Sequence, residues 1–395
     1  MASMNRIRRL GRDESGMSYV FIGMGMMAFL SASMLAIDVG MLMTARNQAQ
    51  NSADAGALGG ATALLFDDFE DRTPTGPAVT SAIAAATANQ VMGNQSTNEG
   101  VVSVTPDDVE FLNDPQGEPT RVKVTVYRTA ARGNPVSTLI AQYFGVTDVG
   151  IGATATAEVS PANAMTCVKP FTIPDKWNEM QDPPWDGSDT YDAFNNKGEP
   201  LPNPDVYIPA TSPGYTGYNQ ESSRGQVLVL RAQTGQNINA SFYYSLSMGK
   251  PVITGGEEYR WNIANCNKTI YYYNDPLVQE PGAMEGPTIQ GADELIAKDP
   301  TAYWDDATNR VKGSAYSGQS PRVFPIPLYD PVVYDSGKRN GRTADLVTAN
   351  WIGFFLESTQ GNGIWGRIIP IAGIRDMNAG PAPVGLNPKA IRLVQ

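Results

Sequence analysis

The chain has 395 residues, of which 42% are hydrophobic and 17% charged. It is long enough for two or three domains and can bury a sizeable hydrophobic core, which excludes a disordered protein. Its 29 basic and 40 acidic residues give a net charge of −11, which repels phosphate backbones and argues against a nucleic-acid partner. Histidine is absent, which excludes Ser-His-Asp and Cys-His catalysis and removes the commonest transition-metal ligand.

The N-terminal region has the pattern of a membrane anchor. Residues 1–16 carry four arginines. Residues 17–37 hold no charged side chain, and this run of 21 residues is long enough for a helix that spans a membrane. Because the basic cluster precedes the apolar run, the sequence predicts a cytoplasmic segment at 1–16 and a single-pass inner-membrane anchor at 17–40. The rest of the chain is then periplasmic or extracellular. Asp38 closes the span, where we expect its carboxylate to reach the lipid headgroups.

Cleavage of this N-terminal region is an alternative. Ser31-Ala32-Ser33 places small residues where signal peptidase requires them, although the apolar character continues past Ser33. A prepilin-type site is disfavoured, because the fifth residue after Gly16 is Phe21 and not a glutamate. In either case most of the chain leaves the cytoplasm.

The two cysteines, Cys167 and Cys266, are too few for a structural zinc site, which needs about four ligands. They form either a disulfide or two buried thiols. Because export places them in an oxidising compartment, we expect a disulfide. No metal and no cofactor are expected.

Small side chains recur at every fourth position after the span. Residues 41–66 contain no proline, and the row of alanines from Ala45 to Ala61 would form a smooth ridge on a helix. Each helical glycine costs about 1 kcal/mol relative to alanine, so a compensating contact is expected. The sequence therefore predicts close helix–helix packing through a small-residue face consisting of Ala49, Ala53, Gly56, Ala57 and Gly60.

The same stretch resembles a known family. Asp38 at the end of the span, followed by Gln50, Asn51 and Asp54 in an alanine-rich helix, is similar to the N-terminal region of the TadE/TadG-like proteins of bacterial Flp (Tad) pilus assembly. The resemblance covers about residues 12–65. It implies a non-enzymatic role, with membrane lipid and other pilus or secretion-system proteins as partners of the 41–66 helix, and leaves a homo-oligomer open.

The exported part divides into two domains. Residues 67–162 are predicted to form a small α+β domain: a helix at 78–92, a hairpin of strands at 107–112 and 120–127, a short helix at 135–144 and a strand at 151–159. Residues 163–395 hold every tryptophan and most prolines, which is typical of a loop-rich, mainly β domain. The fold class is therefore α+β, with a transmembrane helix extended into a long helix.

Candidate chemistry in the exported part is sparse. Residues 186–190 spell the D-x-S-x-T pattern of a metal-ion-dependent adhesion site, but no buried strand precedes them, so a turn is favoured. Carboxylate pairs such as Glu257-Glu258 and Asp305-Asp306 would suffice for glycoside hydrolysis, yet nothing selects one pair. The aromatic residues fill a core or form a sugar- or partner-binding face.

Two functions follow from these observations. The leading hypothesis is a membrane-anchored scaffold or minor subunit of a Tad/Flp-type pilus or a related secretion assembly. The alternative is a membrane-anchored carbohydrate-binding protein or hydrolase at the cell surface that uses aspartate and glutamate chemistry.

Overall fold

The protein forms two compact units in the computed structural model, unit 1 (Met1–Glu158 with Arg392–Gln395) and unit 2 (Val159–Ile391). The structure describes residues 15–67, 71–93, 100–115, 117–195, 197–220, 222–233, 235, 237–248, 255–282, 284–339 and 346–394. The arginines of the predicted cytoplasmic segment, at positions 6 to 12, lie outside the described residues.

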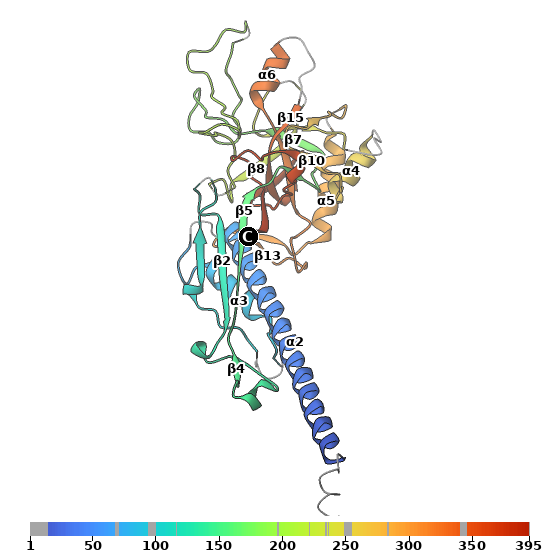
Figure 1. The fold of residues 1–395 in the computed structure, drawn as a ribbon. Helices are drawn as coiled ribbons and strands as arrows, with labels where there is room; N and C mark the ends of the chain where they lie inside the picture. Colours follow the sequence, from blue (N-terminus) through green and yellow to red (C-terminus); the bar gives the residue numbers. More distant parts are fainter. Residues whose placement is uncertain are drawn as a thin grey trace, which may run out of the picture. The chain divides into compact units, whose positions relative to one another are not determined.

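Unit 1 begins with one uninterrupted helix, α2 (Ser15–Phe66), drawn in blue in Figure 1. Its 52 residues, at about 1.5 Å each, extend for about 78 Å. No proline or other breaker separates the apolar run from the small-residue stretch, so the two predicted helices are a single element.

A helix and a sheet pack beside the C-terminal half of α2. The helix α3 (Pro77–Thr87) begins with proline at its first position, which suits a residue without a free N–H. The sheet has the strand order β1-β2-β5-β17 and is formed by β1 (Val109–Leu112), β2 (Arg121–Arg128), β5 (Ile151–Pro161) and β17 (Lys389–Val394). The predicted hairpin is confirmed, because β1 pairs antiparallel with β2, and the valines of β2 are buried in strict alternation.

The short helix predicted at 135–144 is largely wrong. The segment instead forms the small ladder of β3 (Val136–Ser137) and β4 (Asp148–Val149), and only η3 (Ala141–Phe144) is helical, as a single 3₁₀ turn. Thr138 donates its backbone N–H to the carbonyl of Thr147, which favours a hairpin over an α-helix. Two further 3₁₀ turns in unit 1 are η1 (Pro106–Asp108) and η2 (Ala130–Arg132).

Unit 2 is built on a mixed sheet with the strand order β11-β15-β14-β7-β9-β8-β16. Because β16 also pairs with β15, six of these strands close into a ring, and hydrogen bonding continues around it. Where β15 pairs with β16, a Cβ atom on Gly353 would overlap the backbone oxygen of Ile369, and one on Gly366 would overlap that of Phe355. Only glycine permits the two strands to approach so closely. The strands are β7 (Phe171–Pro174), β8 (Val227–Ala232), β9 (Phe242–Ser245), β11 (Pro276–Leu277), β14 (Val323–Tyr329), β15 (Leu346–Gln360) and β16 (Gly363–Ile369).

Three helices of unit 2 were not predicted from the sequence: α4 (Gly256–Ala264), α5 (Glu285–Lys298) and α6 (Pro331–Arg339). Helices α4 and α5 pack together, and Gly291 of α5 lies against the backbone of α4. The remaining elements are the strand pairs β6 (Ala164–Met165) with β10 (Tyr271–Tyr272) and β12 (Tyr303–Asp305) with β13 (Arg310–Lys312), and the turn η4 (Met377–Ala379).

Aromatic side chains form much of the core of unit 2. Trp177, Trp351 and Tyr218 are fully buried, and Tyr244, Tyr329 and Tyr334 pack against one another in tilted and edge-to-face pairs with ring centroids 5.3 to 5.8 Å apart. Such pairs add roughly 0.5–1.5 kcal/mol each to the area that they bury. Of the two interpretations of the aromatic enrichment, the structure therefore favours a filled core over an exposed binding face.

Candidate functional site

The N-terminal half of α2 has the surface of a membrane-embedded helix. Its apolar side chains, including Tyr19, Met27 and Phe29, are exposed on all sides, and the helix is long and apolar enough to cross a membrane. The uncharged residues 17–37, at about 1.5 Å each, span about 31 Å, which matches a hydrocarbon core of about 30 Å. A helix that is apolar all round requires apolar surroundings, which a bilayer supplies.

The small-residue face of α2 is buried inside unit 1. Ala49, Ala53 and Ala57 are almost completely inaccessible to solvent, as are Ala45 and Ala61 in the same row. The surfaces that cover this face belong to α3 and β2 of the same chain, so the chain itself occupies the face that we expected to meet other proteins.

The glycines of this face explain why the packing is so close. A Cβ atom on Gly56 would lie 2.9 Å from the Cβ atom of Ala86, and one on Gly60 would lie 2.9 Å from a methyl group of Val122. The backbone oxygens of α3 are only a few tenths of an ångström farther away, at 3.1 to 3.2 Å. The absence of side chains thus lets α3 and β2 approach the α2 backbone directly, which offsets the cost of helical glycine.

Asp38, at the end of the uncharged run, is buried, with only 3% of its surface exposed. Its two carboxylate oxygens accept the backbone N–H groups of Leu139 at 2.9 Å, Ile140 at 3.0 Å and Ala141 at 2.5 Å. Leu139 and Ile140 precede η3 and Ala141 is its first residue, so the carboxylate caps this turn across about a hundred residues of sequence. This partner could not be predicted from the sequence, because nothing local links the two segments.

The three other motif residues, Gln50, Asn51 and Asp54, lie between three and five helical turns beyond Asp38. Gln50 donates to Asp54 at 2.8 Å and to the carbonyl of Thr154 in β5 at 3.2 Å, so it fastens α2 to the sheet. Asn51 is exposed. A cavity of about 630 Å³ adjoins them and is lined by Gln50, Asp54, Thr154, Ala155, Thr156, Leu393 and Val394.

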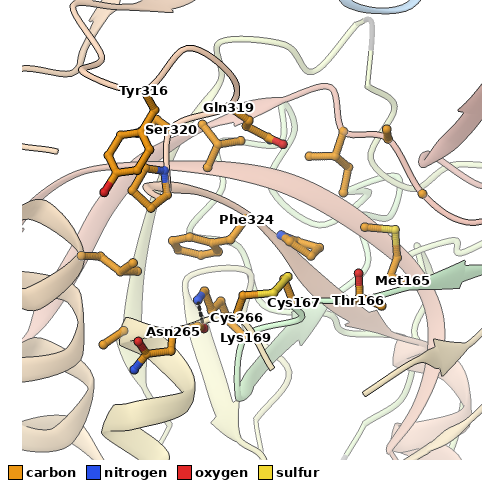
Figure 2. Close-up of a pocket in the computed structure, with 18 of the residues that line it drawn as sticks. Met165, Thr166, Cys167, Lys169, Asn265, Cys266, Tyr316, Gln319, Ser320 and Phe324 are labelled. Atoms are coloured by element: carbon orange, nitrogen blue, oxygen red, sulfur yellow. Dashed lines mark hydrogen bonds between the residues drawn. A yellow bond between two sulfur atoms is a disulfide. The ribbon is translucent and has the colours of Figure 1, made fainter. Parts of the chain in front are cut away.

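In unit 2, the predicted disulfide between Cys167 and Cys266 is confirmed and lies on the wall of a cavity of about 660 Å³ (Figure 2). Lys169 also lines this cavity and donates to the carbonyls of Ile263 at 2.5 Å and Asn265 at 2.7 Å, which closes the C-terminal end of α4. Burial, together with the nearby charge of Lys298, lowers the pKa of Lys169 to about 7. No carboxylate is among the described residues that line the cavity, so two-carboxylate hydrolysis has no basis there.

The acidic candidates form turns and ion pairs. Asp186 accepts the backbone N–H and the hydroxyl of Ser188, which is the predicted turn, while Asp305 pairs with Lys312 at 2.6 Å and Asp306 with Arg367 at 2.9 Å. Glu257 and Glu258 begin α4. Within the described residues, no group of three or more Cys, Asp or Glu side chains is arranged to hold a metal ion.

Sequence reasoning missed one carboxyl pair. Glu179 and Asp205 share a hydrogen bond, and burial raises the pKa of Asp205. Their oxygens also accept the indole N–H of Trp177 at 3.1 Å and the backbone N–H groups of Met180 at 2.8 Å and Asp192 at 2.7 Å. Because these oxygens are committed to loop backbone and to a buried tryptophan, the pair organises the fold of unit 2 and does not face a substrate.

A second buried carboxyl group has the same character. Asp175 is fully buried and accepts the hydroxyls of Tyr207 at 3.0 Å and Tyr215 at 2.6 Å and the backbone N–H of Tyr218 at 3.1 Å. Desolvation raises the pKa of Asp175 to about 6 despite these donors. The carboxyl group of Asp175 therefore holds Tyr207, Tyr215 and Tyr218 of the 205–218 loop at the end of β7.

Comparison with known proteins finds a similarity only in the N-terminal region of the chain. No curated protein and no solved structure matches the chain. One family model does match, over residues 16–63, and its description is "Putative Flp pilus-assembly TadE/G-like". The matched region contains the apolar span, Asp38, the small-residue face and the Gln50-to-Asp54 motif. The similarity of this chain to the TadE/G-like family therefore lies in its N-terminal region, at residues 16–63.

Proposed function

We propose that the chain is a non-enzymatic, membrane-anchored component, either a scaffold or a minor subunit, of a bacterial Tad/Flp-type pilus or related secretion assembly. The observation that carries the proposal is the coincidence of the family match at 16–63 with an exposed apolar helix of spanning length. In this proposal residues 1–16 stay in the cytoplasm, residues 17–40 cross the inner membrane, and the remainder of unit 1 and all of unit 2 lie beyond it.

The buried contacts of α2 suggest how the anchor would work. Because α3 and β2 pack directly on α2 at Gly56 and Gly60, the rest of unit 1 is joined to this helix by a packed interface and not by a flexible linker. A force on the exported units would therefore reach the membrane through a packed interface. Partners would meet the exposed polar side of α2, where Asn51 lies, because the small-residue face is occupied.

Photo-crosslinking in cells that assemble the pilus tests this proposal. A photoreactive residue in place of Asn51 is expected to form adducts with other pilus-assembly proteins, and cells without the chain are expected to lose pili. The matched control is the same variant in cells that lack the other pilus genes, where the adducts should disappear. Normal pili in cells that lack the chain, with no adduct at position 51, would refute the assembly role.

A further inference from the structure

The hairpin between β3 and β4 exposes an unusual amount of apolar surface for the tip of a loop. Tyr143 is 82% exposed and Phe144 70%, while Leu139 and Val146 on either side are 57% and 48% exposed. No charged residue occurs from position 133 to position 147. Soluble loop tips are normally polar, so a contiguous apolar tip marks a contact surface.

The tip is a folded structure. The backbone N–H of Tyr143 donates to Ile140 at 3.0 Å, that of Val146 to Ala141 at 3.1 Å, and Gly145 closes the turn with a φ of 86°, which glycine adopts without strain. The Thr138 hydroxyl also binds the carbonyl of Val146 at 2.5 Å. The exposed aromatic rings are therefore presented from a hydrogen-bonded turn.

The tip is also fixed to the membrane helix. The carboxylate of Asp38 accepts the N–H groups of Leu139, Ile140 and Ala141, and Asp38 follows directly after the uncharged residues 17–37. Figure 1 shows this hairpin, with β4, beside α2. If residues 17–37 fill the hydrocarbon core, Asp38 lies at its outer boundary, and the aromatic tip lies at the depth of the headgroups.

We propose that the 138–147 hairpin is a second membrane contact of this protein, which inserts Tyr143 and Phe144 into the outer interface of the bilayer that α2 spans. The proposal rests on the proposed anchor function. Aromatic side chains favour this interface because it accepts both an apolar ring and a polar edge. The tip is apolar and uncharged and lies next to the end of the apolar span, and these properties suit contact with a lipid surface.

A second contact would give the anchor an orientation. A lone helix can rotate about its axis, whereas a helix with a side hairpin in the interface has one preferred rotation. Asp38 is the positioning residue in this arrangement, because it holds the hairpin at the level of the interface.

Depth-dependent fluorescence quenching of the full chain in vesicles tests the proposal. Both native cysteines are paired, so Gln142→Cys provides a single thiol for an environment-sensitive dye and leaves the four apolar side chains in place. In vesicles that contain lipids with a nitroxide near the headgroup, we expect blue-shifted emission from this dye and a loss of emission. Thr62→Cys, an exposed site near the far end of the same helix, is the matched control and should show neither effect.

Two variants separate the possible outcomes. Tyr143→Ser with Phe144→Ser should abolish the quenching of the dye at position 142, and Asp38→Ala should do so by releasing the hairpin. A dye at Gly25→Cys, which has open space around it and lies near the middle of the uncharged run, reports the anchor independently in vesicles whose lipids carry the nitroxide deep in the acyl chain. Quenching of the dye at position 25 without quenching at position 142 would overturn the contact between hairpin and membrane but leave the anchor in place. The apolar tip would then be a surface that binds a protein partner. Absence of quenching at both sites would overturn the anchor as well.

Discussion

Replacing both Cys167 and Cys266 by serine is expected to lower the free energy of unfolding of unit 2 by about 4–5 kcal/mol. The disulfide joins residues that are 99 positions apart, and its removal releases a long loop in the unfolded chain. It connects the segment between β6 and β7 to Cys266, two residues after the C-terminal end of α4, so the helix would also lose a fixed position.

Denaturant unfolding followed by tryptophan fluorescence measures this loss. All tryptophans lie between positions 177 and 365, so the emission reports on unit 2 alone. Reduction of the wild-type protein should reproduce the loss, while the double-serine variant should be insensitive to reductant. Two titratable thiols in the folded, unreduced wild-type protein would contradict the prediction.

Replacing Gly60 by leucine is expected to separate α3 from α2 and to destabilise unit 1 by about 3 kcal/mol or more. A Cβ atom at this position already lies 3.2 Å from the backbone oxygen of Ala78, which cannot move without displacing α3. The better helix propensity of leucine returns only about 1 kcal/mol. The same substitution at Ala49, Ala53, Gly56 and Ala57 should act in the same direction, because all of them share the buried face.

Hydrogen exchange of the α3 backbone in detergent or nanodiscs measures this effect. The matched control is Gly40→Leu, which places the same side chain on the same helix in open space and should leave α3 protected. If α3 exchanged equally slowly in both variants, the glycine face would not be needed for close packing.

The sequence predicted the elements whose periodicity is local. The alternation in residues 121–126 predicted β2, and the uncharged run at 17–37 predicted the N-terminal half of α2. Helices α5 and α6 were missed because glycine and proline lie within or at the start of them: Pro287 sits in the first turn of α5, and Pro331 begins α6. Both positions tolerate proline because the first N–H groups of a helix have no partner.

The candidate site was predictable only in part. The small side chains at 49–60, with their helical glycines, predicted close packing over a solvated helix, but no pattern showed that the approaching helix would be α3 of the same chain. The role of Asp38 depends on a loop about a hundred residues away, and the ring of strands in unit 2 depends on a second pairing of β15. Long-range contacts of this kind leave no local trace in one sequence.

Fractionation of cells that express the full chain with a C-terminal tag tests the membrane anchor most directly. The expected result is full-length protein that stays in membranes after alkaline washing, with a tag that external protease removes from spheroplasts but not from intact cells. This outcome would place the chain after residue 40 in the periplasm, with the N-terminal half of α2 in the inner membrane. A shortened, soluble product, cleaved near Ser33, would contradict the anchor and make the protein a secreted one.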